Sequence, residues 1–152
     1  MLSPLNITLL ALGLILGLLA SVNNASIGTG ILIGAGVFKR RKALIVSALG
    51  VLTGTIMEGI RMSGATSKLT TASQEPLAMA SVLLSTIIVL YLLTVKGMPV
   101  SITQMTVSAI LSVALLTSAF LNVPYLLEII SGWVLAPLAS LLLSSILYKQ
   151  LI

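Results

Sequence analysis

The sequence predicts an all-α integral membrane protein, on the evidence of its composition, its long apolar segments and its few charges. Of the 152 residues, 58% are hydrophobic and only 7% are charged. A soluble domain has about a quarter of its residues charged, because its surface faces water. Most apolar side chains of this chain are therefore expected to face lipid. We expect one transmembrane domain over residues 1–152 that crosses the cell membrane several times.

The N-terminal half contains three apolar segments. The first, 5–22, has no basic residues before it, so it is expected to be a retained helix rather than a signal peptide. The second, 25–38, is short and rich in glycine, and the basic residues 39–42 end it. The third covers 43–60, and the polar loop 63–76 follows it. A crossing needs about 20 residues, so the second segment is expected to be broken or re-entrant.

Three further segments follow in the C-terminal half. Residues 77–95 form an uninterrupted apolar run, and the breaker sequence Lys-Gly-Met-Pro at 96–99 ends it. The fifth segment, 100–121, starts with polar residues beside this break, and it is the second segment expected to be broken. The last covers 125–148. We therefore expect five to six membrane segments, two of them interrupted.

The basic residues predict the orientation of the chain. If all six segments cross, residues 39–42, Lys96 and Lys149 lie on the side of both termini, and Arg61 and Lys68 lie on the other. Cytoplasmic loops carry an excess of Lys and Arg, so both termini are expected in the cytoplasm. The net charge of +5 does not predict nucleic-acid binding, because no aromatic or Arg-rich surface accompanies it.

The first polar constellation follows the first segment and consists of Asn23, Asn24, Ser26, Gly28, Thr29 and Gly30. Adjacent amides within apolar flanks are costly unless they are paired. Amide donors, a closely approachable backbone and a helix start together favour an oxyanion. Two alternatives stay open: an interfacial turn with Ser26 as a helix N-cap, and close helix packing at Gly30 and Gly34.

The second constellation surrounds the break that Gly97 and Pro99 predict. Ser101 and Thr103 supply hydroxyl groups, and Gln104 supplies both a donor and an acceptor. Interrupted backbone leaves N–H groups that an anion can use. The alternative is a plain loop in which Ser101 caps the next helix.

The segments around Asn23, Gly97 and Trp133 resemble three motifs of the inorganic phosphate transporter (PiT) family, which includes related sulfate permeases. That family carries N-D-x-x-N-x-x-G-T-x-V-G after its first helix, G-x-P-V-S-T-T-H later, and W-x-x-x-P near the end. The matching residues here are Asn23, Gly30 and Gly34, then Gly97, Pro99, Val100, Ser101 and Thr103, then Trp133 and Pro137.

The chain departs from these motifs at Asn24, Ile27, Ile31, Ile102 and Gln104. Asn24 stands where the family has Asp, and Gln104 stands where it has His. Shifting the alignment by two residues would place Gly28 and Thr29 on the G-T of the motif. The missing carboxylate bears on the coupling ion, for which the resemblance implies sodium or a proton near Asn23 and Asn24.

The resemblance implies a half-size member, because the family has two inverted repeats and this chain covers one. A second half, identical or related, would complete a transporter of phosphate or a sulfate-like oxyanion that works by alternating access. The implied substrate-binding residues are Asn23, Asn24, Ser26, Thr29, Ser101, Thr103 and Gln104. The alternative is a non-transporting subunit that regulates a full anion transporter. Neither an enzyme nor a resident metal or cofactor is expected, since the chain has no His, Asp or Cys.

Overall fold

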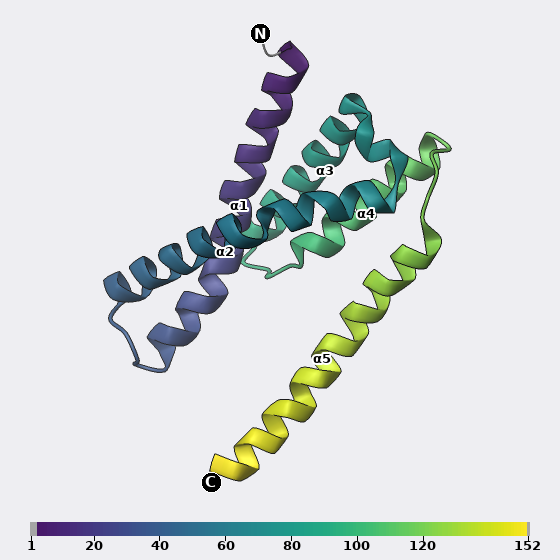
Figure 1. Cartoon of the computed structure of the whole chain (residues 1–152). Helices are drawn as coiled ribbons and strands as arrows, with labels where there is room; N and C mark the ends of the chain where they lie inside the picture. The colour runs from purple at the N-terminus through teal and green to yellow at the C-terminus, as the bar shows by residue number, and fades with distance from the viewer. Residues whose placement is uncertain (1–2, 152) are drawn as a thin grey trace.

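The computed structural model describes the backbone of residues 3–151, and every element in that range is helical (Figure 1). The side chains of Ser26, Glu58, residues 60–63 and Leu151 lie outside the described part. The elements are α1 (Pro4–Gly34), α2 (Arg40–Leu69), the 3-10 helix η1 (Thr71–Gln74), α3 (Pro76–Val95), α4 (Ile102–Leu116) and α5 (Val123–Leu151). The all-α prediction is confirmed for this range.

Helix α1 is a single unbroken helix of 31 residues, so the predicted interruption at Asn23 and Asn24 is wrong. Gly28 and Gly30 lie inside it and do not break it, and Gly34 is its last residue. An Asn or Gly costs at most about 1 kcal/mol in a helix interior. Opening backbone hydrogen bonds in apolar surroundings costs several kcal/mol, so the helix continues. The first two predicted segments therefore form one helix.

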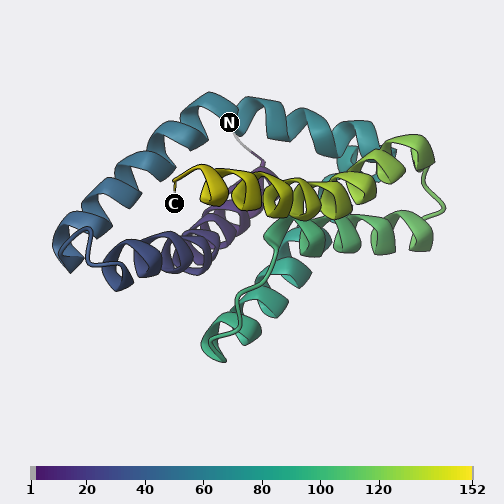
Figure 2. The ribbon, with the colours of Figure 1, turned by 90° about the horizontal axis from the view of Figure 1, so that it is seen from below.

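The continuity of α1 also changes the predicted orientation of the chain. The N-terminus and the basic residues 39–42 are at opposite ends of α1, and the C-terminus lies far from the N-terminus (Figure 1). The two termini therefore do not share one side with the basic turn, as six separate crossings would require. Seen from below, α2 forms a wide arch from the basic turn toward η1 (Figure 2).

The predicted break at residues 96–101 is present. Helix α3 ends with Gly97 in the left-handed region, at a φ of 70°. The N–H of Gly97 donates to the Thr94 carbonyl at 2.9 Å, and the N–H of Met98 donates to the Leu93 carbonyl at 3.0 Å. This pair of bonds is a Schellman motif, in which only glycine takes the left-handed conformation without strain. Pro99, which has no N–H to donate, then prevents the helix from resuming at once.

In the described part of the chain, three helices are long and apolar enough to cross a membrane: α1, α3 and α5. Helix α4 has 15 residues and is therefore about 22 Å long. A bilayer core is about 30 Å thick, so α4 is too short to cross it alone. The fifth predicted segment, 100–121, is thus a shorter helix than its apolar run suggested, because Thr117 and Ser118 end it.

The polar stretch 63–76, predicted to be a loop, is mostly helical. It contains Thr70, a polar residue that is almost completely buried. Helix α2 extends to Leu69, and η1 follows directly. Thr70, between them, is only 1% exposed. Its hydroxyl donates to the Phe120 carbonyl at 2.7 Å and accepts from the Ala72 N–H at 3.2 Å. Its backbone forms an isolated bridge with Leu121. Thr70 therefore joins the end of α2 to the connection between α4 and α5.

Replacing Thr70 with Val is expected to lower the free energy of unfolding by about 2 kcal/mol, because two buried hydrogen bonds lose their partner. Thr70→Ser keeps the hydroxyl and is the matched control, with a smaller expected loss. Thermal unfolding in detergent, followed by circular dichroism, measures both. Equal stability of the Val variant and the parent protein would show that this junction does not hold the two parts together.

The packed centre is small and lies where α2, α3, α4 and α5 approach one another. Its buried members are Leu69, Val82, Val107 and Ile110, and Trp133 packs against them. Trp133 is half-buried against this core. The rest of the molecule is open: the chain has a mass of 15.8 kDa and a solvent-accessible surface of 10900 Å². A compact protein of this mass exposes about 7300 Å².

Candidate functional site

The middle of α1 contacts the C-terminal end of α3, and this contact brings the two predicted constellations together. Asn23 is 5% exposed, and its amide Nδ2 donates to the hydroxyl Oγ1 of Thr94 at 3.3 Å. The residues are 71 positions apart in the sequence. The hydroxyl of Thr94 accepts here, so its own proton is available to a ligand.

An open pocket of about 390 Å³ surrounds this contact. Its polar groups come from Asn23 and Thr94 and from the backbone at the break. Such a pocket is large enough for an ion with several waters, since one water occupies about 30 Å³. Its lining residues are Val22, Asn23, Ile27, Thr94, Gly97, Met98 and Pro99.

The break at 96–101 places a helix C-terminus and a helix N-terminus at its two ends, with opposite electrostatic character. The C-terminal carbonyls of α3 form a negative end that favours a cation, and the first N–H groups of α4 form a positive end that favours an anion. Ser101 is the N-cap of α4 and accepts from the Gln104 N–H at 3.4 Å, so the predicted capping alternative is present. The N–H groups of Ile102 and Thr103 have no partner within the helix.

The other predicted residues of the first constellation point elsewhere. Asn24 is exposed on α1. It follows Asn23 in the helix, so its side chain points in a different direction and lies outside the pocket. The side chain of Ser26 lies outside the described part. Thr29 is 6% exposed and lies in a groove between α1 and α2, where its hydroxyl donates to the Ala25 carbonyl.

The predicted glycine packing is not present inside this chain. A Cβ added at Gly28, Gly30 or Gly34 would meet no described atom within 4 Å outside its immediate surroundings. None of these three glycines therefore has a described neighbouring helix of this chain close enough to need it.

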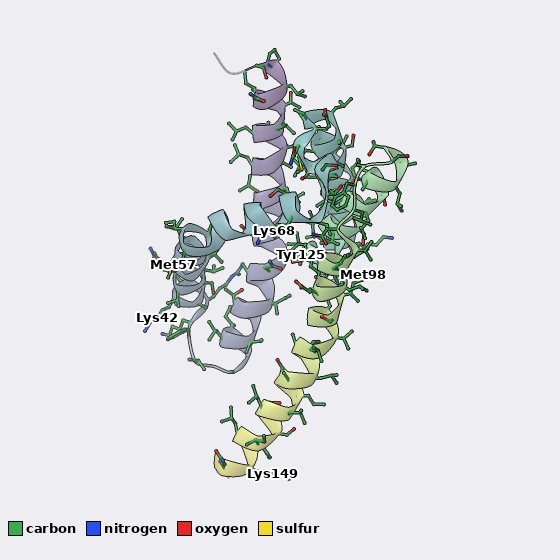
Figure 3. All side chains as sticks on the ribbon, turned by 45° about the vertical axis from the view of Figure 1, so that its right-hand side comes forward. Lys42, Met57, Lys68, Met98, Tyr125 and Lys149 are labelled. Carbon is green, nitrogen blue, oxygen red and sulfur yellow. The ribbon has the colours of Figure 1, made fainter. Side chains whose placement is uncertain are left out.

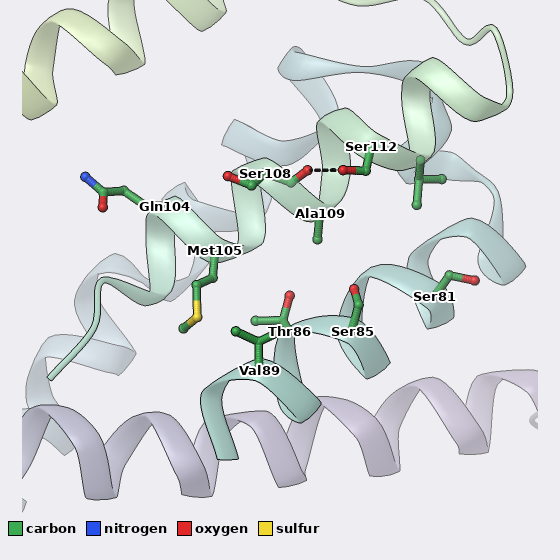
Figure 4. A pocket seen from close by; sticks show the side chains of 10 residues that line it. Ser81, Ser85, Thr86, Val89, Gln104, Met105, Ser108, Ala109 and Ser112 are labelled. Atoms are coloured by element: carbon green, nitrogen blue, oxygen red, sulfur yellow. Dashed lines mark hydrogen bonds between the residues drawn. The ribbon is translucent and has the colours of Figure 1, made fainter. Parts of the chain in front are cut away.

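The second constellation divides over two sides of α4. Thr103 lines a pocket of about 220 Å³ between α2, α4 and α5. Gln104 lines a different groove, between α3 and α4 (Figure 4). The structure therefore joins Asn23 to Gly97 and Pro99, but it does not gather all seven predicted binding residues in one cavity.

Sequence reasoning missed Thr94 and the groove between α3 and α4, which several serines border. The groove has a volume of about 530 Å³, and Figure 4 shows the side chains that border it. A signal was available in the spacing of four between polar residues, which places them on one face of a helix. These polar residues are Ser81 and Ser85 on α3, and Gln104, Ser108 and Ser112 on α4.

The hydroxyl groups of this groove mostly donate to carbonyl oxygens of their own helices, as those of Ser81, Ser85, Thr86 and Ser112 do. Their oxygen atoms then remain as acceptors toward the groove. The side chains of Gln104 and Ser108 make no hydrogen bond with the described residues, so they add donors there. Hydroxyl groups bonded to their own helices are satisfied even in lipid, so only Gln104 and Ser108 need a partner from water or protein at this face.

Comparison with known proteins gives one match. Residues 20–151 match the model of a family described as the phosphate transporter family. No curated protein and no solved structure matches the chain. The matched range includes Asn23, Thr94, the break at 96–101 and the groove between α3 and α4.

Proposed function

The chain belongs to the phosphate transporter family, and from that premise we propose that it carries inorganic phosphate, or a sulfate-like oxyanion, across the membrane as one half of a transporter. One observation carries the proposal beyond the family match. Asn23, from the first motif, lies in one pocket with Gly97 and Pro99 of the second, although they are far apart in the sequence. The pocket adjoins the short break at 96–101 between the end of α3 and the start of α4.

We assign the two ions to opposite ends of the break at 96–101. The anion binds at the start of α4, where the N–H groups of Ile102 and Thr103 and the hydroxyl of Ser101 supply donors. The coupling cation, where it is sodium, binds near Asn23 and Thr94 at the end of α3; a coupled proton would need a titratable group, which neither residue has. Interrupted helices of transporters divide anions and cations between their positive and negative ends in this way. The described residues contain no cluster of acidic or His side chains, so neutral oxygens would hold the cation.

A second half is proposed to cover the open side of this chain. The 10900 Å² exposed are about 3600 Å² more than a compact protein of this mass exposes. Interfaces between obligate partners bury roughly 2000 to 5000 Å² in total, or about 1000 to 2500 Å² on each partner, so the excess on this chain is more than large enough for one such interface. The two halves would enclose the groove between α3 and α4 as a water-filled path, and their rocking would open the site to each side in turn.

The test of the proposed function is uptake by liposomes that contain the purified chain. Labelled phosphate and labelled sulfate are supplied with a sodium gradient, a proton gradient or neither. We expect saturable uptake of at least one anion, accelerated by one of the two gradients. Absence of uptake under every condition would overturn transport by this chain alone.

One observation favours the regulatory alternative. Asn24 occupies the position of the motif carboxylate, yet it is exposed and outside the pocket. A chain that lost this carboxylate could pair with a complete transporter and adjust its activity. That reading predicts no uptake by the chain alone and a changed uptake rate when a complete family member is reconstituted with it.

The absence of cysteine from the chain allows a clean test of the water-filled path. Ser85→Cys on the groove is expected to react with a membrane-impermeant thiol reagent at least about tenfold faster than Leu84→Cys, because thiolates form in water rather than in lipid. Leu84 is half-exposed, adjacent in sequence and at the same depth, but it does not border the groove. Equal labelling of the two variants in liposomes would contradict an aqueous groove.

A further inference from the structure

The first turn of α2, together with the residue before it, carries four consecutive cations, and nothing in the described structure neutralises them. Lys39, Arg40, Arg41 and Lys42 are all exposed, and none forms an ion pair with a described residue. Lys42 lies over the ring of Phe38, with its Nζ 4.8 Å from the ring centroid. Figure 3 shows Lys42 at the edge of the molecule, well away from Lys68 and Lys149.

This arrangement works against the stability of α2. The helix starts at Arg40, has no acidic residue in its first turn, and receives no side-chain hydrogen bond from its N-cap, Lys39. Cations at a helix N-terminus are unfavourable because the helix dipole is positive there. Neighbouring like charges add repulsion. Such a local conflict is typical of positions kept for binding rather than for folding.

The surroundings of the turn identify the anion that relieves this conflict. Apolar side chains on both sides of the four cations are exposed. Before them Val37 is 60% exposed, and after them Leu44 and Ile45 are 50% and 53% exposed. Exposed apolar side chains at the end of the apolar helix α1 and at the start of α2 place this junction at the edge of the hydrocarbon layer. The cations between them are then at the level of the lipid headgroups, where clusters of Lys and Arg attract anionic lipids.

We propose that the turn formed by residues 39–42 binds the headgroup phosphates of anionic phospholipids. Lys39, Arg40 and Arg41 contact the lipid phosphates, and the aliphatic stem of Lys42 stays against Phe38 with its charge at the same level. The exposed first N–H groups of α2 complete the site. This inference does not depend on transport, because it concerns the surface of the membrane and not the pocket at Asn23.

The test measures lipid binding to the purified chain in a neutral detergent. Dioctanoyl phosphatidylglycerol and dioctanoyl phosphatidylcholine are the probes, titrated by thermophoresis. The triple variant Lys39→Gln, Arg40→Gln, Arg41→Gln is expected to lose about a hundredfold in affinity for the anionic lipid, since each cation contributes about fivefold. The matched control removes three other charges, with Lys68, Lys96 and Lys149 changed to Gln, and should change affinity by less than about threefold.

The parent protein should bind the anionic lipid more tightly than the zwitterionic one, and rising salt should weaken this preference. Equal loss in both triple variants would overturn the proposal, because net charge alone would then explain the binding. Displacement of the lipid by millimolar inorganic phosphate would also overturn it, by showing that the turn prefers the free ion. Circular dichroism of each variant confirms that α2 is retained.

Discussion

Replacing Ser101 with Asp is expected to abolish phosphate transport while leaving the helix that it caps intact. Asp caps a helix N-terminus as well as Ser does, so the stability of α4 should be kept or slightly raised. The new carboxylate would lie beside the proposed anion site. Two like charges about 4 Å apart repel by about 4 kcal/mol near a protein surface, which is a loss of at least about a hundredfold in affinity.

Ser101→Asn is the matched control for this prediction. Asn has the same size as Asp, caps helices equally well and carries no charge. Uptake by the Asn variant should stay within about tenfold of the parent rate, because its amide still offers a donor to the anion. Transport by the Asp variant at the rate of the Asn variant would place the anion away from the start of α4. Initial rates of labelled phosphate uptake in liposomes measure all three proteins.

Replacing Asn23 with Leu is expected to weaken the binding of the coupling cation, so that transport needs a higher cation concentration. Leu has nearly the same shape, but it offers no oxygen to a cation and no donor to Thr94, which accepts from Asn23 at 3.3 Å. Loss of a buried polar partner costs about 1 to 3 kcal/mol, so the cation concentration that half-saturates uptake should rise by at least about fivefold.

Two comparisons separate this effect from a loss of folding. Asn24→Leu changes the neighbouring amide, which is exposed and outside the pocket, and should leave the cation dependence unchanged. Thr94→Val should reproduce the effect of Asn23→Leu, and the double variant should add little, because the two residues form one contact. An unchanged cation dependence in Asn23→Leu would exclude this pocket as the cation site.

Of the two helix breaks that the sequence predicts, one is present in the structure and the other is not. The break at Gly97 and Pro99 was predictable, because Pro lacks an N–H and Gly accepts a left-handed backbone. The supposed break at Asn23 and Asn24 was not real, since neither residue removes a backbone hydrogen bond. In apolar surroundings a weak helix former stays in the helix, whereas the same residues in water would more readily form a turn.

The partners of the site were not predictable from the sequence. The residues Asn23 and Thr94 meet because α1 passes the end of α3, and no local pattern encodes that crossing. The prediction that the two constellations approach each other relied on the resemblance to a family. Thr70 is a further example: the polar composition around it indicated a loop, but its hydroxyl bonds the connection between α4 and α5.

The central claim is that a single break in this chain holds an anion at one end and a cation at the other. Titration calorimetry of the purified protein with phosphate, with and without sodium, tests it most directly, and a pH series replaces sodium if the proton is the coupled ion. Binding of one ion should tighten binding of the other by the same factor. The account predicts saturable phosphate binding that the cation strengthens and that Ser101→Asp removes. Phosphate binding that is indifferent to both cations and to the Ser101→Asp change would contradict it.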